Sequence, residues 1–570
     1  MNGETFCEHF AKFADAPNSI QKLRELIFQL AVQGKVVSQD KNAEPASVLF
    51  SKIQAERELL IARRAIRRSK PLPVIDAAEV PFEIPATWLW VRFDDVGDWG
   101  AGATPNRGRP DYFGGEIKWF KSGELNDAYI DDSEEKITEL ALKECSLREN
   151  QPGDVLVAMY GATIGKVAIL NVAATTNQAV CACTCHTGVF NRYLFLMLKA
   201  FKPYFISNSS GAAQPNFSKE KIVRTPFPLP PLAEQRRIVA KVDQLLGLCN
   251  ELAARQAAQR QKRQRLVGAT LDRLVSTRSP AEFPTHTHRL RNHFDQLFDT
   301  PTTIPQLRQT ILQLALQGQL VPVRRNEEVT AETLLAMERE RMSLSFASGD
   351  QPKLESEYAA LRAAGPNQDG SRRYISARCI CDFITKGTTP AASELMPQGD
   401  VPFLKVYNIV KNVLNFEYKP TFVRKIVHET ELRRSKIQPG NVLMNLVGPP
   451  LGKVAVVTEE YPEWNCNQAL VIFKPISFYD SKFLSYIIGC PATLKEILQD
   501  TRGTAGQDNI SLEQSRNLRI PLVSLEYQRR FIAEVTELLS LCDALEAKLT
   551  QAESAGTQLL SAAVHSLLQN

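Results

Sequence analysis

Apolar residues recur at intervals of three and four between positions 232 and 252, which predicts a helix with one apolar face. The recurring positions are Ile238, Val242, Leu245, Cys249 and Leu252. This spacing places side chains on one side of a helix. A proline-rich entry ends at Pro231, and proline is favoured where a helix begins. We therefore expect a long helix over residues 232 to about 275.

The same pattern occurs twice in the chain. Residues 528–545 match residues 235–252 at ten of 18 positions without a gap, at an offset of 293 residues. Residues 304–323 likewise match residues 20–39 at ten of 20 positions, at an offset of 284. Repeats that keep their order indicate a duplicated unit. The chain is thus predicted to be a tandem duplication, with a second long helix from 525 to about 568.

Each half is predicted to begin with a helical hairpin. The first helix, at 20–39 or 304–323, contains a glycine at its end, which is typical of a helix C-terminus. Weaker helices are expected at 48–68 and 331–344, and proline-containing linkers around 70–84 and 348–370.

Between the hairpin and the long helix, each half carries short runs of alternating apolar residues broken by Gly, Asn and Pro, which predicts a mixed strand-and-turn globule. Paired landmarks keep their order: Gly102-Ala-Thr-Pro105 with Gly387-Thr-Thr-Pro390, Ile117-Lys-Trp-Phe-Lys121 with Val401-Pro-Phe-Leu-Lys405, Gln151-Pro-Gly-Asp-Val-Leu156 with Gln438-Pro-Gly-Asn-Val-Leu443, and Asn177-Gln-Ala179 with Asn467-Gln-Ala469. The sequences between the landmarks diverge. A common frame with different loops is what two copies of a binding domain with different specificities would show.

Composition adds little to this picture. The 570 residues are 44% hydrophobic and 23% charged, as in a globular protein of several folding units. The net charge is +5, with 14 basic against 10 acidic residues over 372–480 but 9 against 15 over 86–190, so charge alone would not indicate nucleic acid. The polar N-terminal sequence, the lack of a membrane-length apolar run and the odd number of cysteines, 11, predict a cytoplasmic protein with reduced thiols and no membrane.

The chain resembles the DNA specificity subunit of type I restriction-modification systems, the HsdS family. The resemblance rests on PLPPLAEQRRIVAKVDQLL and its second copy, on the LRxxIxQxAxQGxxV hairpins and on the landmarks, and it covers nearly the whole chain. It implies a mixed α/β fold of two pseudo-symmetric halves, in which two long helices pair as an antiparallel coiled coil. The expected domains are an N-terminal helical hairpin (1–70), target recognition domain 1 (85–230), the first long spacer helix (231–277), a second helical hairpin (300–345), target recognition domain 2 (371–522) and the second long spacer helix (523–570).

The resemblance also implies a function without catalysis by this chain. It implies that each recognition domain reads one half of a bipartite, asymmetric sequence in double-stranded DNA, and that the subunit docks two methyltransferase (modification) subunits and two restriction (motor-nuclease) subunits. S-adenosylmethionine would belong to the methyltransferase subunits, and ATP and Mg to the restriction subunits, with no cofactor on this chain. The whole complex would be a site-specific deoxyribonuclease and adenine-N6 DNA methyltransferase. Two globules on one spacer can contact half-sites about one helical turn, ~34 Å, apart.

Loop residues beside the landmarks are the expected DNA contacts, because these positions differ between the halves on a common frame. Arg, Lys and Asn can pair with base edges, whereas Ser, Thr and Lys more often hold phosphates. An ordinary solvated loop position is the alternative at each site. The candidates are Thr104, Asn106, Arg107, Arg109, Lys121, Ser122, Glu124, Asn126, Tyr160, Thr163 and Lys166 in the first half, and Lys386, Thr388, Thr389, Lys405, Tyr407, Asn408, Lys411, Asn445 and Lys453 in the second.

A second set of residues is identical in both halves, which sequence-specific recognition would not require. These are Gln235, Arg236, Arg237 and Gln528, Arg529, Arg530. Docking of two identical partner subunits or phosphate contact is one hypothesis, and side chains that cover the helix seam are the other. We favour docking or a structural role.

Three motifs suggest other chemistry, but each departs from the pattern that this chemistry needs. Residues 161–167 and 448–454 resemble a nucleotide-binding loop, yet both have three residues between the glycines and a Val after the Lys, so a turn between strands is expected. Asp111, Glu116 and Lys118 resemble a metal-dependent nuclease motif that the second half lacks, and a solvated loop is favoured.

Cysteines 181, 183 and 185, with His186, could bind a metal ion. However, alternate residues of a strand face one side, so these thiols could equally line a core, as could Cys379 and Cys381. No second Cys or His pair with zinc-site spacing follows. We expect the core arrangement.

Two rival functions remain: a self-contained DNA methyltransferase or nuclease, and a coiled-coil scaffold that binds protein. The sequence contains no Asn-Pro-Pro-aromatic tetrapeptide and no convincing glycine-rich strand-to-helix loop for S-adenosylmethionine. This favours recognition over catalysis.

Overall fold

The computed structural model describes residues 16–40, 44–210, 215–277, 279, 281–344, 349–365, 373–448, 450–499 and 509–569. The polar N-terminal sequence at 1–15 lies outside the described residues. So do Pro449 in the second nucleotide-loop-like motif, residues 500–508 of the second predicted recognition domain, and residues 348 and 366–370 of the second predicted linker.

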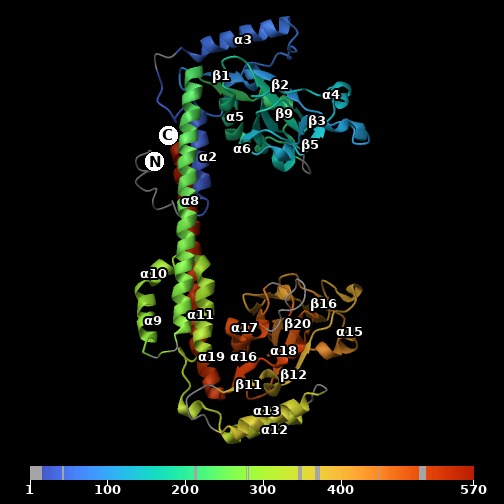
Figure 1. Cartoon of the computed structure of the whole chain (residues 1–570), viewed down its shortest axis with the longest axis vertical. Coiled ribbons are helices and arrows are strands. Elements are labelled where there is room, and N and C mark those ends of the chain that lie inside the picture. Colours follow the sequence, from blue (N-terminus) through green and yellow to red (C-terminus); the bar gives the residue numbers. More distant parts are fainter. Residues whose placement is uncertain are drawn as a thin grey trace. The chain divides into compact units, whose positions relative to one another are not determined.

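The chain divides into two compact units, each with one strand-containing domain. Unit 1 comprises residues 1–260 and 552–570, and unit 2 comprises residues 261–551. The long helices α8 (Leu232–Ser276) and α19 (Leu525–Gln569), each of 45 residues, have residues in both units (Figure 1). The first part of each helix shares a unit with the last part of the other, so the helices run antiparallel, as expected.

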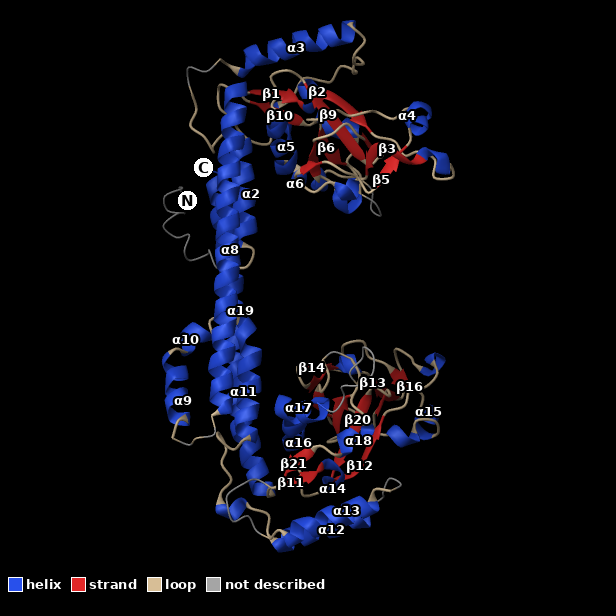
Figure 2. Ribbon diagram, viewed as in Figure 1, coloured by secondary structure: helices blue, strands red, loops and turns tan. Residues whose placement is uncertain are grey.

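The domain of unit 1 contains three sheets. A five-stranded sheet has the order β2-β9-β6-β7-β4, a three-stranded sheet the order β5-β3-β8, and β1 pairs with β10 (Figure 2). The strands are β1 (Leu89–Arg92), β2 (Gly97–Ala101), β3 (Phe113–Phe120), β4 (Tyr129–Ile130), β5 (Glu135–Ile137), β6 (Val155–Ala158), β7 (Val167–Leu170), β8 (Thr175–Thr176), β9 (Val180–Cys185) and β10 (Pro226–Leu229). The helices are α4 (Glu139–Glu144), α5 (Asn191–Ala200), α6 (Lys202–Ser207) and α7 (Lys219–Arg224).

The domain of unit 2 repeats most of this topology, but its largest sheet has four strands, and β14 and β15 form a separate pair. Its sheets have the orders β12-β20-β17-β18, β16-β13-β19, β11-β21 and β14-β15, and β13 runs parallel to β19 as β3 does to β8. The strands are β11 (Tyr374–Ser376), β12 (Cys381–Lys386), β13 (Val401–Leu404), β14 (Ile409–Val410), β15 (Val413–Leu414), β16 (Phe422–Val423), β17 (Val442–Asn445), β18 (Val454–Val456), β19 (Asn465–Cys466), β20 (Leu470–Pro475) and β21 (Arg519–Pro521). The helices are α14 (Ala377–Ile380), α15 (Lys425–Glu429), α16 (Ser481–Ile488), α17 (Pro491–Gln499) and α18 (Leu512–Arg516). The two halves therefore share one mixed α/β fold.

The central strand of each domain is buried on both faces. In β6, Val155 and Val157 pack into the core that contains α5, whereas Leu156 and Ala158 pack into a smaller core on the opposite face. Successive side chains of a strand point to opposite faces, so the continuous apolar run Val-Leu-Val-Ala serves two cores. The strand β17 divides its side chains between two cores in the same way.

The structure places the two helices of each predicted hairpin differently. In unit 1, α2 (Ser19–Val32) lies along α8, whereas α3 (Ala46–Ala62) bonds to the domain, where Glu56 accepts from the backbone and hydroxyl of Thr187. In unit 2, α11 (Ile304–Leu316) lies beside the long helices, and α12 (Ala331–Ser343) contacts α13 (Gln351–Ala363). Helix α13 lies where a linker was predicted. Its apolar residues Leu354 and Tyr358 are buried, which explains why this stretch is ordered.

The long helices are held by a third helix in each unit. In unit 2, Val267 and Leu271 of α8 share a core with Ile311 of α11 and Cys542 of α19, next to α9 (Phe283–Asn292) and α10 (Phe294–Leu297). In unit 1, α2 packs on Leu560 and Val564 of α19. No helix among the described residues has both the length and the apolar content that crossing a bilayer requires.

Candidate nucleic-acid interface

The landmark glycines fix where the first recognition loop of each domain begins. The N–H of Gly102 donates to Val180 O at 3.0 Å, and that of Gly387 donates to Leu470 O at 2.9 Å. A Cβ atom at Gly102 would lie 2.1 Å from Thr176 O, and one at Gly387 would lie 2.2 Å from Asn467 O. No side chain fits at this distance, so both repeats need glycine for packing.

The second loop of each domain is held by one side chain at equivalent positions. The Lys121 N–H donates to Glu124 Oε2 at 2.6 Å, and the Lys405 N–H donates to Asn408 Oδ1 at 2.9 Å. Asn408 is 1% exposed, and its Nδ2 donates to Asn415 O and Tyr418 O. Its amide is committed to the backbone, which corrects the prediction that Asn408 contacts bases. Glu124 has the same structural role.

The nucleotide-loop-like segments are turns between antiparallel strands, as predicted. They join β6 to β7 and β17 to β18, and Gly161, Gly165, Gly448 and Gly452 adopt positive φ angles of 60°, 75°, 87° and 74°. In the first turn, Thr163 Oγ1 donates to Tyr160 O at 2.7 Å.

The second turn is held by Asn445, which is 1% exposed. Its Nδ2 donates to Pro450 O at 2.9 Å, and its Oδ1 accepts from the Lys453 N–H at 2.6 Å. Asn445 therefore shapes the turn, and the prediction that it contacts bases is also corrected.

Three of the four basic candidates of the first domain are paired with carboxylates. Arg107 and Lys121 both bond Glu135, and Arg109 pairs with Asp111 at 2.5 Å. The Arg109 guanidinium lowers the pKa of the Asp111 carboxyl below its usual value through a side-chain hydrogen bond. Asp111 thus belongs to an ion pair, which agrees with a solvated loop rather than a nuclease site.

The remaining candidates of the first domain lie on or near the surface. Thr104 and Asn106 are exposed in the first loop, where Thr104 bonds Gln178 and Asn106 Oδ1 accepts from the Gly108 N–H at 2.9 Å. Asn126 is exposed, and Ser122 and Lys166 are half-buried.

The second domain presents basic groups with fewer acidic partners. Among the described residues, Lys386, Lys405 and Lys453 have no carboxylate at ion-pair distance. The Lys405 ammonium lies 5.9 Å from the centre of the Tyr407 ring. Lys411 pairs with Glu546 of α19 at 3.1 Å.

Three polar candidates of the second domain have local partners, which for Thr388 is Cys466 O, 3.0 Å from its backbone N–H. Tyr407 is half-buried, with its hydroxyl 3.3 Å from that of Thr421. Thr388 and Thr389 follow β12, where the Gln468 N–H donates to Thr389 Oγ1 at 3.4 Å.

The repeated Gln–Arg–Arg set divides into buried and exposed residues. Gln235 is fully buried, accepts from the Phe190 N–H at 2.8 Å, and donates to Gly188 O at 3.1 Å and Pro230 O at 3.0 Å. Gln528 is equally buried and bonds Asp480 N, Phe478 O and Val523 O. Both glutamines clamp a domain to its long helix, which corrects the prediction that they lie on a docking surface.

The two arginines that follow each glutamine differ from one another. Arg237 donates to Ser38 O at 3.3 Å, and its counterpart Arg530 donates to Pro322 O at 2.7 Å and pairs with the buried Glu327 at 2.6 Å. Arg236 and Arg529 are exposed, and no ion pair to either is found in the described part of the chain.

Sequence reasoning missed Asp127 and Asn412, which adopt positive φ angles of 61° and 60° at equivalent positions. The Oδ1 of Asp127 accepts from Val167 N at 3.2 Å, and that of Asn412 accepts from Val454 N at 3.1 Å. Asp and Asn tolerate this conformation better than most residues. The two residues are separated by nearly the same offset as the neighbouring landmarks, and this repeat was the sequence signal that could have identified them.

The cysteines line cores, as expected. Cys181, Cys183, Cys379 and Cys381 are fully buried, and Cys185 is half-buried. Burial raises the pKa of the Cys181 thiol to about 12, so this thiol stays protonated at neutral pH.

One His and two Glu side chains in unit 2 lie close enough to share a metal ion: His428, Glu429 and Glu463, with ligand atoms within 4.8 Å. However, Lys425 Nζ already bonds Glu463 at 2.6 Å and Glu429 at 3.2 Å. The Asn465 amide donates to Leu432 O at 3.2 Å and lies 3.1 Å from His428 Nδ1, which assigns the ring proton to Nε2. The Lys425 ammonium and these hydrogen bonds therefore stabilise the cluster without a metal ion.

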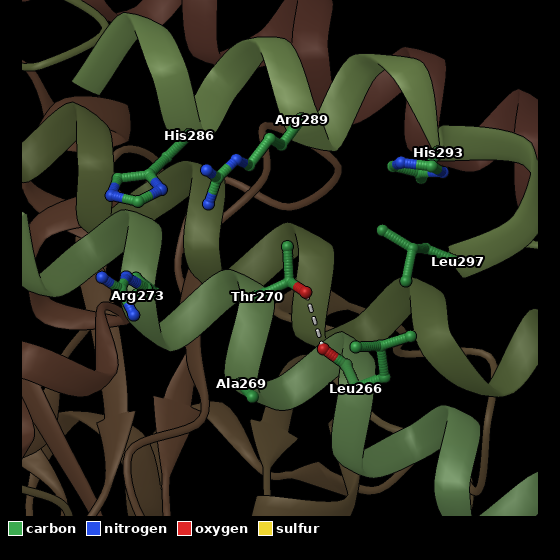
Figure 3. Close-up of a pocket in the computed structure, with 8 residues that line it drawn as sticks. All are labelled: Leu266, Ala269, Thr270, Arg273, His286, Arg289, His293 and Leu297. Atoms are coloured by element: carbon green, nitrogen blue, oxygen red, sulfur yellow. Dashed lines mark hydrogen bonds between the residues drawn. The ribbon is translucent and has the colours of Figure 1, made fainter. Parts of the chain in front are cut away.

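A cavity of about 400 Å³ lies between α8, α9 and α10 in unit 2 (Figure 3). Arg273, His286 and Arg289 gather at one end, and Leu266 and Leu297 contribute apolar surface. None of the predicted DNA-binding residues lines it.

The chain thus contains two copies of one domain with variable loops, and each copy is bonded to the start of a long helix. This arrangement is that of a recognition protein with two binding domains. The model of the type I restriction modification DNA specificity domain matches residues 85–259 and again 378–553. The chain belongs to this family. The first matched stretch contains one domain, the second contains the other domain without β11, and each includes the first part of one long helix.

Individual relatives are similar over different shares of the chain. The EcoEI type I restriction enzyme specificity subunit of Escherichia coli is 27% identical over 95% of this chain and 93% of its own length. The EcoAI specificity subunit of the same species is 30% identical over 57% of this chain and 56% of its own length. A chain solved in work on complex assembly and conformational transition of the type I R-M system has a TM-score of 0.44 at 17% identity, covering 86% of this chain and 99% of that one.

Replacing the buried glutamine with leucine should destabilise unit 1. Gln235→Leu leaves Phe190 N, Gly188 O and Pro230 O without their partner, and we expect the free energy of unfolding to fall by about 2 kcal/mol. Urea titration followed by tryptophan fluorescence reports mainly on this unit, since four of the five tryptophans, Trp88, Trp90, Trp99 and Trp119, lie in it. The exposed neighbour change Arg236→Ala is the control. An equal effect of both changes would contradict the clamp.

Proposed function

We propose that this chain is the non-catalytic DNA sequence-recognition subunit of a type I restriction-modification complex, with one recognition domain for each half of a bipartite, asymmetric target. The observation that carries the proposal is one fold, built twice on the same glycine and glutamine contacts, with different side chains on the intervening loops. Duplication of the frame gives two binding sites, and divergence of the loops gives two specificities.

The remaining candidates for DNA contact are the surface residues of these loops. In the first domain they are Thr104, Asn106, Arg107, Arg109, Lys121, Ser122, Asn126, Tyr160, Thr163 and Lys166, and in the second Lys386, Thr388, Thr389, Lys405, Tyr407, Lys411 and Lys453. We assign the chemistry to other polypeptides: two methyltransferase subunits that bind S-adenosylmethionine, and restriction subunits that use ATP and Mg. The complex would act on DNA in the cytoplasm.

Repeated exposed residues support two equal docking sites for one kind of partner. Leu248 and Leu541 are 54% and 61% exposed at equivalent positions of α8 and α19, and Leu266 and Leu559 are 59% and 61% exposed. Each unit contains one leucine of each pair. Arg236 and Arg529 add an exposed guanidinium to each unit, with no ion pair to the residues that the structure describes. Two identical partners need the same surface twice, whereas DNA recognition does not.

Methylation mapping tests the proposed function. In the source organism, adenine methylation should occur at a bipartite, non-palindromic motif with an unread gap, and deleting the gene for this chain should remove it. The motif is detected by single-molecule sequencing of genomic DNA from both strains. A continuous or palindromic motif, or methylation that survives the deletion, would refute the assignment. Methyl transfer or Mg-dependent cleavage by the purified chain alone would favour the enzyme hypothesis instead.

Removing the repeated arginines should weaken assembly without changing sequence preference. We expect Arg236→Ala with Arg529→Ala to raise the Kd for the methyltransferase subunit about tenfold, since an interface arginine commonly contributes ~1–2 kcal/mol. Calorimetry measures the Kd, and methylation mapping measures the motif. The matched control is Arg255→Ala with Lys548→Ala, which removes two charges from equivalent positions of the same helices. An altered motif, or equal weakening by the control, would contradict docking through these arginines.

A further inference from the structure

Two cations of the first recognition domain converge on a single carboxylate. Glu135 Oε2 accepts from Arg107 at 2.6 Å, and Glu135 Oε1 accepts from Arg107 at 3.3 Å and from Lys121 at 3.1 Å. Lys121 also bonds Glu134 at 2.9 Å. Both oxygens of Glu135 are therefore held by cationic donors.

The surrounding residues hold this group in one geometry. The Arg107 guanidinium lies 4.7 Å from the centre of the Phe113 ring and 5.2 Å from that of Trp119, which is 1% exposed. Trp119 also faces Glu135 in the register of β3 and β5. A guanidinium stacked on an aromatic ring loses little further entropy when it binds an anion.

Burial is uneven in this group. The side chains of Arg107 and Glu134 are 55% and 72% exposed, whereas Lys121 and Glu135 are more shielded. The side chains of Lys121 and Glu135 are 29% and 32% exposed. Hydrogen bonds donated by Arg107 and Lys121 lower the pKa of the Glu135 carboxyl, and hydrogen bonds that Lys121 donates to Glu134 and Glu135 raise the pKa of Lys121. Lys121 and Glu135 are thus both charged at neutral pH.

The second domain has the lysine but not the carboxylates. Lys405 is the counterpart of Lys121, and Thr421, bonded through its carbonyl to Phe403 N, occupies the position of Glu135. Lys405 lies against the Tyr407 ring instead of an acid. The equivalent lysine is thus free of carboxylate partners in the second domain, among the described residues, and is paired with carboxylates in the first.

We propose that Arg107 and Lys121 form a DNA-phosphate site that Glu135, assisted by Glu134, fills until DNA displaces it. A carboxylate and a phosphate both present oxygens that accept from guanidinium and ammonium donors, so Glu135 stands in for the phosphate. Displacement costs the first domain its internal ion pairs, which weakens attraction to DNA of any sequence. When the DNA contains the correct half-site, contacts to its bases offset this loss. The inference rests on the proposed function and assigns Arg107 and Lys121 to the phosphate backbone rather than to bases.

The test compares binding of the complex with methyltransferase subunits to duplexes with and without the mapped motif, by fluorescence anisotropy over a range of salt. Glu134→Gln with Glu135→Gln should tighten binding to motif-free duplex about tenfold at low salt. It should also make the slope of log K against log salt about 2 more negative, because each freed cation that meets a phosphate contributes about 0.9. The matched control, Glu139→Gln with Glu149→Gln, removes the same charge from exposed positions of the domain.

Further variants separate the possible outcomes. Adding Arg107→Ala and Lys121→Ala to the glutamine variant should abolish the gain, and these two changes alone should weaken motif binding about tenfold. The inference is overturned if the control gains as much, if the gain survives without the two cations, or if the alanine changes leave motif binding unaltered. A wild-type complex that does not prefer the motif would instead refute the proposed function, which keeps the two failures distinct.

Discussion

One buried glutamine at the start of each long helix joins recognition domain to helix, and the rest of the structure depends on this contact. Gln235 and Gln528 each satisfy three backbone groups in a dry environment. An unpaired buried amide costs free energy, so these bonds favour the observed placement of the domain at the start of the helix. Since the partners are main-chain atoms, the contact tolerates any sequence in the recognition loops.

The other shared contacts belong to the same frame. Arg24 of α2 donates to Asn250 of α8 at 2.6 Å, and the equivalent Arg308 of α11 pairs with Asp543 of α19 at 2.6 Å. The landmark glycines admit a neighbouring backbone that no side chain would allow. The two halves thus share their packing and turn geometry, but they differ in the charges on their loops. Lys121 is paired with carboxylates, whereas Lys405 has no such partner among the described residues.

The sequence predicted this frame well because its signals are local or repeated. Helix periodicity, the offset of 293 and the glycine landmarks gave the long helices and the two-copy fold. Individual site residues were harder to predict. Asn408 and Asn445 are of a residue type that often binds bases. However, their side-chain amides bond to backbone groups of turns, and no local sequence pattern specifies the geometry of these turns.

The pairing of Arg107 with Glu135 could not be predicted from the sequence for a related reason. The register of β3 and β5 places Glu135 opposite Trp119, and Arg107, from the loop before β3, lies over the Trp119 ring. This is a property of the folded sheet rather than of either segment. Helix α13 was taken for a linker because its prolines and polar residues outweigh a short apolar face that becomes useful only when Leu354 and Tyr358 have a core to enter.

Exchange of whole recognition domains tests most directly the central claim that each domain reads its own half-site on a common frame. In the exchanged chain, residues 374–524 are replaced by residues 89–231. Both segments begin at the strand that pairs with the last strand of the domain, and both end directly before a long helix. Methylation mapping of cells that carry this chain should show a motif with two copies of one half-site and none of the other. An unchanged wild-type motif, or a motif with a half-site that the wild type never reads, would contradict the account.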